Sequence, residues 1–133
     1  MVRHTIVLVE NDPGLLGLLT LELELEGHAV QSYTNAEDVL MTQQKPPDLA
    51  ILDYRLPGMN GLVLLERLRR DYPRLPALII SSEFTAEYLP AGPDLPITQL
   101  LRKPFAHDAF IAEVSALLAG TAEVASHPLQ SRY

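Results

Sequence analysis

The sequence predicts an α/β fold in which a parallel sheet of five strands is covered by helices on both faces. Three observations carry this prediction. Short apolar runs alternate along the chain with segments of helical spacing, which is typical of strand–helix–strand units. The runs are apolar at nearly every position, as in strands that are buried on both faces. Three of them end in charged residues, which places polar groups at the carboxyl edge of the sheet.

Composition agrees with one globular domain, since 133 residues suffice for a single core and are short for two. The net charge of −7 argues against a nucleic-acid surface, which is ordinarily basic. There is no cysteine, which excludes disulfides and thiolate chemistry. No apolar stretch reaches the roughly 18–20 residues that span a bilayer, and the start of the chain does not resemble a secretory signal. We therefore expect a cytoplasmic protein that binds neither membrane nor nucleic acid.

The first strand is expected over residues 4–9, a short β-branched run. Asp12 and Pro13 then give a helix start, with a capping side chain before a proline. Residues 19–26 alternate leucine and threonine or glutamate as a strand would. We still predict a helix, because leucine and glutamate are strong helix formers and Gly27 provides a stop.

A second strand is expected over His28–Tyr33. Residues 34–37 have the pattern of a capping box, which opens a helix to about Gln44. The prolines at 46–47 end that helix, and residues 48–53 form the third strand. A third helix follows Asn60–Gly61, with leucines spaced three residues apart along one buried face (Leu62, Leu65 and Leu68).

The fourth strand is expected over residues 77–80 and the fifth over residues 97–102. The connection between them is unusual. Residues 83–89 can form a helix of two turns, but four closely spaced prolines and glycines then forbid a regular continuation, so the fourth helix should be short and irregular. A last helix begins near Phe105. We expect the folded domain to span residues 1–120 and residues 121–133 to form a flexible tail.

Right-handed crossovers and a flavodoxin-like strand order, 2-1-3-4-5, fit this series of elements. We expect that order to bring strands one, three and five together at the centre of the sheet. Their ends carry Glu10-Asn11-Asp12, Asp53 and Lys103-Pro104. Acidic groups, a nucleophilic carboxylate and an ammonium would then share one pocket, and this combination binds a divalent cation and a phosphoryl group.

Four segments resemble the receiver domain of two-component response regulators, over about residues 3–119. They are residues 9–13 after strand one, residues 52–61 after strand three, residues 80–82 after strand four and residues 103–105 after strand five. Each segment alone is commonplace. All four in this order, at domain-scale intervals, are highly specific.

The resemblance implies that Asp53 accepts a phosphoryl group from a histidine kinase or a histidine phosphotransfer protein. It implies a Mg²⁺ site made by Glu10, Asn11, Asp53 and the backbone carbonyl of Arg55. Two further residues are implied to bind phosphoryl oxygens, the first through its hydroxyl and the second, before a cis proline, through its ammonium: Ser81 and Lys103.

Three features depart from the family pattern. Asn11 stands where a second acid is usual, which should weaken Mg²⁺ binding, and Asp12 is expected to cap the first helix instead of replacing that acid. Leu100 occupies the switch position, where many receivers carry a rotating aromatic ring. The proline-rich connection alters the usual output surface.

We expect a single-domain response regulator that is not an enzyme and signals by binding a downstream protein. The alternative is a phosphorylation-independent pseudo-receiver that acts as an interaction module. A flavodoxin-like cofactor binder fits poorly, because acids after the first strand would repel a phosphate that lacks a metal. Leu21 and Leu25 exceed what one helix face can bury, and they suit docking of a partner helix. Whether the chain forms a homodimer stays open. The arginines at 67, 69, 70 and 74 are expected to form a solvated face.

Overall fold

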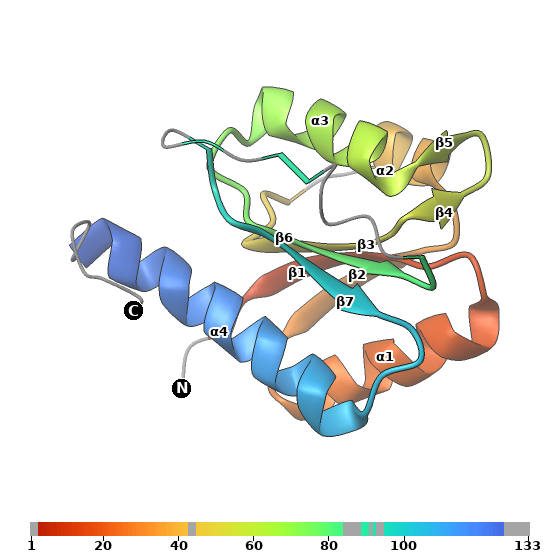
Figure 1. Cartoon of the computed structure of the whole chain (residues 1–133), viewed down its shortest axis with the longest axis horizontal. Helices are drawn as coiled ribbons and strands as arrows, with labels where there is room; N and C mark the ends of the chain where they lie inside the picture. The colour runs from red at the N-terminus through yellow and green to blue at the C-terminus, as the bar shows by residue number, and fades with distance from the viewer. Residues whose placement is uncertain (1–2, 43–44, 84–88, 91, 93–94, 127–133) are drawn as a thin grey trace.

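The computed structural model describes residues 3–42, 45–83, 89–90, 92 and 95–126. A five-stranded sheet lies between two layers of helices, with α2 and α3 on one face and α1 and α4 on the other (Figure 1). In chain order the elements are β1 (Thr5–Val9), α1 (Pro13–Leu25), β2 (Ala29–Tyr33), α2 (Ala36–Thr42), β3 (Leu49–Asp53), β4 (Arg55–Leu56), β5 (Met59–Asn60), α3 (Gly61–Asp71), β6 (Ala77–Ser81), β7 (Thr98–Arg102) and α4 (His107–Ser126).

The strand order of the large sheet is β2-β1-β3-β6-β7, and all neighbouring strands are parallel. Because β6 and β7 are the fourth and fifth predicted strands, the predicted order 2-1-3-4-5 is confirmed. The expectation that the fifth strand lies at the centre is wrong, since β7 is an edge strand and β6 separates it from β3. Lys103 therefore has to reach past the end of β6 to meet Asp53.

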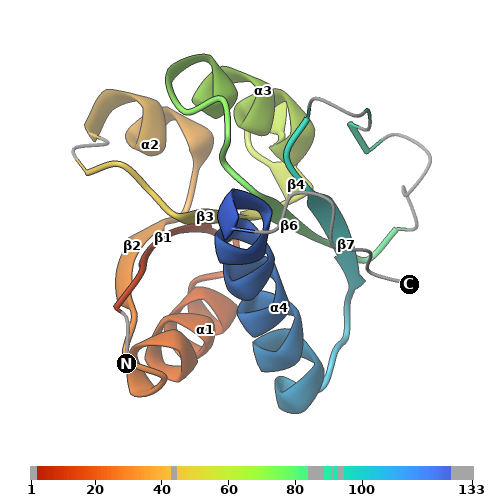
Figure 2. The ribbon, with the colours of Figure 1, turned by 90° about the vertical axis from the view of Figure 1, so that its left-hand side faces the viewer.

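Side chains of the sheet divide between two cores according to the alternation of a β-strand. Figure 2 shows the helices that cover the two faces, α2 and α3 on one and α1 and α4 on the other. Leu52 of β3 and Ile79 of β6 pack against α2 and α3, whereas Ile51 and Leu78 pack against α1 and α4. Every residue of β3 and of β6 is buried. This double burial explains why the strands read as continuous apolar runs in the sequence.

Helix α1 begins as predicted, because Asp12 Oδ1 accepts a hydrogen bond of 3.0 Å from the backbone N–H of Gly14. The helix carries more leucine than its inner face can bury. Leu21 is 53% exposed and Leu25 is 76% exposed. The prediction that these two leucines lie outside the core is confirmed.

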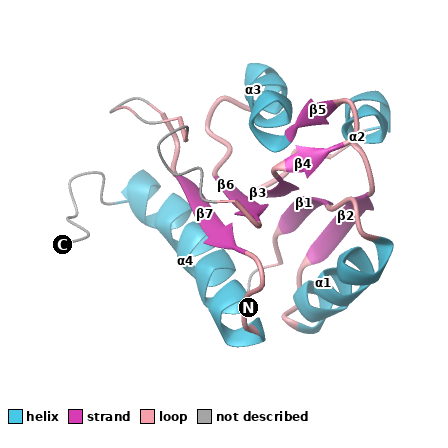
Figure 3. Cartoon of the chain, turned by 45° about the vertical axis from the view of Figure 1, so that its right-hand side comes forward, coloured by secondary structure: helices cyan, strands magenta, loops and turns pink. Residues whose placement is uncertain are grey.

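Residues after Asp53 form a small hairpin that we did not predict from the sequence. β4 and β5 pair in antiparallel fashion beside α3 (Figure 3). The two residues between them are Pro57 and Gly58, and Gly58 has a φ of 83°. Proline followed by a glycine with positive φ is the pattern of a type II turn. Strands of two residues are too short to leave a periodic signal in the sequence.

Helix α4 continues to Ser126, past the point where the sequence was expected to lose its periodicity. Alanine and glutamate in that stretch have a high helix propensity, so the helix continues although the sequence there has no apolar stripe. Residues 127–133 lie outside the described residues, so the predicted tail stays a prediction there. The short helix expected over residues 83–89 also falls largely outside the described part, at residues 84–88. The described residues between β6 and β7 contain no helix or strand.

Arg69 does not belong to a solvated face, and that part of the prediction is wrong. Its guanidinium donates to Leu75 O and to Thr98 Oγ1, both at 2.9 Å, and so joins α3 to the start of β7. Burial lowers the pKa of Arg69 to about 10. Arg67 and Arg70 are exposed as expected.

Three of the histidines make contacts that the sequence did not indicate. His4 and His28 are half-buried, and their ring centroids lie 5.6 Å apart. His107 Nδ1 lies 2.9 Å from Glu22 Oε2, which links the start of α4 to α1. Of the helices in the described part of the chain, none is sufficiently long and apolar to traverse a bilayer.

Candidate functional site

Three polar side chains are buried among the described residues, and all three were predicted site residues. They are Glu10, which is 1% exposed, Asp53 at 5% and Ser81 at 1%. Glu10 directly follows β1, Asp53 ends β3 and Ser81 ends β6. These strands are neighbours in the sheet and run parallel, so their carboxyl ends open on one edge. Burying polar groups costs free energy unless they are hydrogen-bonded or ion-paired. Three buried polar groups at one edge therefore mark this edge as the candidate site.

Asp53 is held by backbone on one side and by a cation on the other. Its Oδ1 accepts a hydrogen bond of 3.1 Å from the N–H of Arg55, and its Oδ2 lies 3.3 Å from Lys103 Nζ. The backbone N–H of the next residue, Tyr54, donates to Ile80 O of β6 at 2.8 Å. The sheet and the following turn therefore fix the position of the carboxylate.

Glu10 turns its side chain back into the same pocket. Its Oε2 accepts a hydrogen bond of 3.0 Å from the N–H of Asp12. Its Oε1 lies 2.9 Å from Lys103 Nζ, but outside hydrogen-bond angles, so this buried oxygen accepts no hydrogen bond. Burial raises the pKa of Glu10, and the charge of Asp53 adds to that rise, against the opposing effects of Asp12 and Lys103.

Lys103 is the cation of the site, and its side chain is 23% exposed. Burial by itself would lower the pKa of Lys103. The carboxylates of Glu10 and Asp53 outweigh that effect and raise the pKa above its ordinary value, so the ammonium stays charged. The predicted cis peptide bond between Lys103 and Pro104 is confirmed.

Ser81 lies beside this cluster at the end of β6. Its Oγ accepts a hydrogen bond of 3.0 Å from the N–H of Glu83, and its carbonyl accepts one of 2.7 Å from the N–H of Lys103. The second bond ties the start of the lysine loop to the serine strand. Leu100, the predicted switch position, is half-buried in β7 and packs against the core on the α2–α3 side of the sheet.

The donor set suits a small divalent cation better than a zinc ion. Among the described residues there is no group of three or more histidine, cysteine or acidic side chains placed to hold a metal. The cluster offers two buried carboxylates, Glu10 and Asp53. Asn11, which is exposed, directly follows Glu10 in the chain, and the backbone N–H of Arg55 is bonded to Asp53. Oxygen ligands with room for water are what Mg²⁺ prefers. Oε1 of Glu10 is one of these carboxylate oxygens, and it lies 2.9 Å from the Lys103 ammonium.

Two features of the site were missed in the sequence. The side chains of Arg55 and Glu83 form an ion pair between the loops that follow β3 and β6. Gly61 lies so close to Asp53 that a Cβ there would collide with the backbone carbonyl of Asp53. The ion pair could have been sought from topology, because residues at equal distances beyond the ends of paired strands become neighbours. The close approach of Gly61 has no such signal in the sequence.

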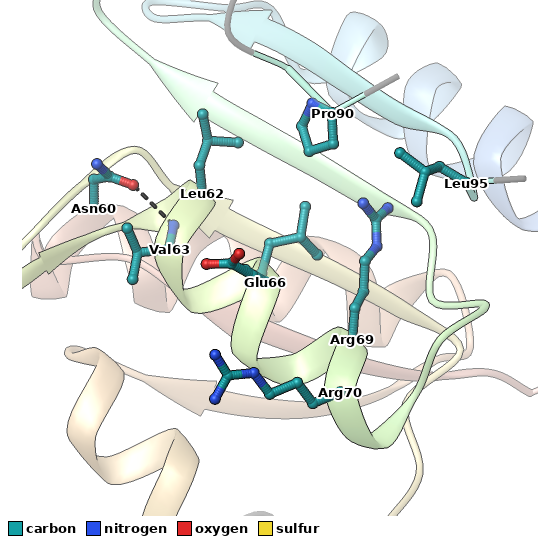
Figure 4. A pocket seen from close by; sticks show the side chains of 9 residues that line it. Asn60, Leu62, Val63, Glu66, Arg69, Arg70, Pro90 and Leu95 are labelled. Atoms are coloured by element: carbon teal, nitrogen blue, oxygen red, sulfur yellow. Dashed lines mark hydrogen bonds between the residues drawn. The ribbon is translucent and has the colours of Figure 1, made fainter. Parts of the chain in front are cut away.

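A cavity in the described part of the chain is lined by residues outside this cluster. It has a volume of about 490 Å³ and runs along the outer face of α3 (Figure 4). Pro90, Leu95 and apolar side chains of α3 line it, together with the guanidinium groups of Arg69 and Arg70. We assign the functional site to the Asp53 cluster, because that is where the buried polar groups converge.

The cluster can carry out one kind of chemistry with what it holds. The fixed carboxylate of Asp53 can act as a nucleophile toward an electrophile that enters from the sheet edge. An ammonium and a hydroxyl lie at hand for anionic oxygens, and acidic oxygens remain for a cation. These are the parts that phosphoryl transfer requires.

Comparison with known proteins identifies the family to which the chain is similar. A family model described as the response regulator receiver domain matches residues 6–115. The transcriptional regulatory protein CssR of Bacillus subtilis is 34% identical over 117 residues, which are 88% of this chain and 52% of that protein. The chain therefore spans about half the length of the curated relatives it matches.

Solved structures share the fold. A CheY-like receiver domain protein from Methanospirillum hungatei superposes with a TM-score of 0.79 at 21% identity, covering 92% of this chain and 98% of the other. The response regulator TrrA of Thermotoga maritima, solved in complex with Mg²⁺ and BeF, gives a TM-score of 0.70 at 23% identity, covering 86% of this chain and 98% of the other.

Proposed function

Because the chain belongs to the response regulator receiver domain family, we propose that it accepts a phosphoryl group on Asp53 and signals through protein–protein contacts. The observation that carries this proposal is the contact between buried Asp53 and Lys103, whose Nζ lies 3.3 Å from Oδ2. The proposed donor is the phosphohistidine of a histidine kinase or of a histidine phosphotransfer protein.

In the proposed step, a carboxylate oxygen of Asp53 attacks the phosphorus of the donor phosphohistidine. The P–N bond breaks, its electron pair stays on the imidazole, and the imidazole takes up a proton. An acyl phosphate remains on Asp53. Lys103 offsets part of the negative charge that builds up where two anions meet, and Ser81 turns its hydroxyl toward a phosphoryl oxygen.

The family binds Mg²⁺, and the residues of this chain that would hold the ion are Glu10, Asn11, Asp53 and the backbone carbonyl of Arg55. When bound, Mg²⁺ supplies the charge that lets a carboxylate and a phosphoryl group approach each other. Glu10 would offer Oε1, a buried oxygen that lies 2.9 Å from Lys103 Nζ. Asn11 contributes an amide in place of a charge, so we expect weaker binding than a second acid would give.

The exposed leucines of α1 supply a docking surface for the phosphodonor protein. Leu21 and Leu25 lie four positions apart in the sequence and therefore on one face of α1, which suits a contact between two helices. Leu100 would respond to the phosphorylated state by repacking, since it cannot swing as an aromatic ring does. We place this activity in the cytoplasm.

The test is to incubate the protein with acetyl phosphate and Mg²⁺ and to measure the intact mass. We expect the wild type to gain one labile phosphoryl group, Asp53→Asn to gain none, and Asp71→Asn, on the exposed end of α3, to behave as the wild type. A folded wild type that gains nothing, or an adduct that survives Asp53→Asn, would overturn the proposal.

The first of those two outcomes favours a second candidate, a pseudo-receiver that binds partners without phosphorylation. The residue that would account for it is Asn11, which lacks the charge of the usual second acid. The variant Asn11→Asp separates the two candidates further. If the chain only binds Mg²⁺ too weakly, Asn11→Asp should be phosphorylated, whereas a pseudo-receiver should stay unphosphorylated.

A further inference from the structure

The cavity on the outer face of α3 has a volume of about 490 Å³ (Figure 4). Sites for small organic ligands commonly have about 300–1,000 Å³ and are lined mostly by apolar side chains with a few polar groups. Here the apolar lining comes from α3, with Leu62 and Val63, and from the connection between β6 and β7, with Pro90 and Leu95. Val63 is 37% exposed and Leu95 is 48% exposed. Apolar side chains that reach solvent beside a cavity offer a surface to the apolar part of a ligand.

Positive charge gathers at the end of α3 that borders the same cavity. Among the described residues that line it, Arg69 and Arg70 carry positive charge and Glu66 carries negative charge. Four of the ten basic residues of the chain lie at positions 67, 69, 70 and 74, although the net charge of the chain is −7. The cavity therefore borders a locally basic surface on an acidic protein.

The charge of Arg69 is not balanced by a carboxylate within the described part of the chain. Its guanidinium donates to four neutral acceptors, Leu75 O, Pro96 O, Ile97 O and Thr98 Oγ1. The ion pairs among the described residues include neither Arg69 nor Arg70. Burial lowers the pKa of Arg69 to about 10, so the group stays positively charged at neutral pH. A half-buried cation beside an apolar wall attracts an anion more strongly than a fully solvated one does, because water screens it less.

We propose that this cavity binds a small organic anion, with an apolar body against Val63 and Leu95 and a carboxylate beside Arg69 and Arg70. A guanidinium can hold both oxygens of a carboxylate at once, which suits this head group. Glu66 opposes binding of an anion and limits its affinity. The inference does not depend on phosphorylation of Asp53, since the described residues that line the cavity lie outside that cluster.

The probe is 4-phenylbutyrate, which joins an apolar ring to one carboxylate through a short chain. It is added to the full chain labelled with ¹⁵N, and the backbone amide signals are followed by two-dimensional NMR. We expect the largest shifts on α3 and at Leu95, with a Kd on the order of 1 mM, as for a ligand of about a dozen heavy atoms. The neutral analogue 4-phenylbutanamide should bind about fivefold more weakly, and the cationic 4-phenylbutylamine more weakly still.

Charge variants test the two signs separately. Arg70→Gln should weaken binding of 4-phenylbutyrate about three- to fivefold, because it removes an attracting charge. Glu66→Gln should tighten binding by about the same factor, because it removes a repelling charge, and a gain in affinity does not arise from loss of the fold. Arg67→Gln removes a positive charge from an exposed position of α3 outside the lining of the cavity, and it should stay within about twofold of the wild type.

The variant Leu95→Ser tests the apolar wall. It should weaken binding of 4-phenylbutyrate and of 4-phenylbutanamide alike, each by at least about threefold, since both lose the same apolar contact. Met41→Ser is the matched control, because Met41 is 80% exposed on α2 and does not line the cavity. It should leave both affinities unchanged.

The outcomes decide the proposal. Shifts on α3 that weaken in the order anion, amide and amine, with opposite effects of Arg70→Gln and Glu66→Gln, would support it. A wild type without saturable shifts on α3 at about ten times the expected Kd would overturn it. Equal affinities for the three probes, or shifts centred on the exposed leucines of α1, would overturn it too, because they indicate unspecific apolar contact. A chain that is never phosphorylated on Asp53 leaves these results as they are, so failure of the proposed function and failure of this site are distinguishable.

Discussion

Lys103 Nζ lies 3.3 Å from Asp53 Oδ2, although fifty residues separate the two in sequence. Lys103 follows the edge strand β7, and its other carboxylate contact, Glu10, follows β1 near the far side of the sheet. One ammonium therefore joins the ends of three strands. With two buried carboxylates and one ammonium, the cluster keeps an excess of negative charge, which is the charge state that attracts a divalent cation.

The close approach of α3 to the acceptor makes Gly61 a sensitive position. In Gly61→Ala the new Cβ would collide with the backbone carbonyl of Asp53 and lie 3.1 Å from its carbonyl carbon. We expect the free energy of unfolding to fall by about 1–3 kcal/mol, as for other overpacked sites. We also expect slower phosphorylation, because the backbone of the acceptor must move.

Gly17→Ala is the matched control for that change. Gly17 lies within α1, and nothing approaches within 4 Å of the position of its Cβ. Alanine there should raise the free energy of unfolding by about 0.5–1 kcal/mol. Urea denaturation followed by circular dichroism measures both variants. Equal stability of the two would show that the contact between Gly61 and Asp53 is not tight.

Arg69 should matter to stability more than its position on an outer helix face suggests. Arg69→Ala leaves Leu75 O and Thr98 Oγ1 without their donor, and such losses cost about 1–3 kcal/mol. Arg67→Ala removes an exposed arginine and should stay within about 0.5 kcal/mol of the wild type. Denaturation curves that rank these two variants in the opposite order would contradict the structural role given to Arg69.

Charge at position 11 should control metal affinity. In Asn11→Asp we expect Mg²⁺ to bind about three- to tenfold more tightly, since one further anionic oxygen faces the cation. Isothermal titration calorimetry measures the change. Gln99→Glu adds the same charge at an exposed position of β7 and should leave the affinity nearly as it was. An unchanged affinity in Asn11→Asp would remove Asn11 from the metal site.

His28 should make the fold sensitive to mild acid. Burial, and then the charge of His4, lower the pKa of His28 below its usual 6.5, against a smaller opposing effect of Glu26. Between that lowered value and 6.5 the unfolded chain binds more protons than the folded chain, so stability falls as the pH falls through this window. His28→Asn should lose less unfolding free energy than the wild type between about pH 7.5 and pH 5.5. An identical loss in both proteins would contradict this role.

Much of the site could be read from the sequence because its residues are tied to strand ends. An apolar run that stops at a charged residue marks both a buried strand and its edge, and this pattern identified Glu10, Asp53 and Lys103. Ser81 was found only through the resemblance to receiver domains, since a serine at a strand end is common. The same holds for the cis bond before Pro104, which nothing in the neighbouring residues indicates.

What was missed depends on contacts that leave no periodic trace. Arg69 looks like its exposed neighbours in sequence, and its partners come from two other parts of the chain, Leu75 before β6 and Thr98 at the start of β7. Arg55 and Glu83 become neighbours because β3 and β6 are adjacent in the sheet. The error about strand five has another origin, since the predicted order 2-1-3-4-5 itself puts the fifth strand at the edge of the sheet, beside strand four.

The most direct test of the account is a crystal structure grown with Mg²⁺ and beryllium fluoride, which mimics a phosphoryl group. We predict density for beryllium bonded to a carboxylate oxygen of Asp53, a cation held by Glu10 and the carbonyl of Arg55, and Lys103 and Ser81 against the fluorides. A structure that leaves Asp53 bare, with Glu10 and Lys103 turned away from it in the presence of both reagents, would contradict the account.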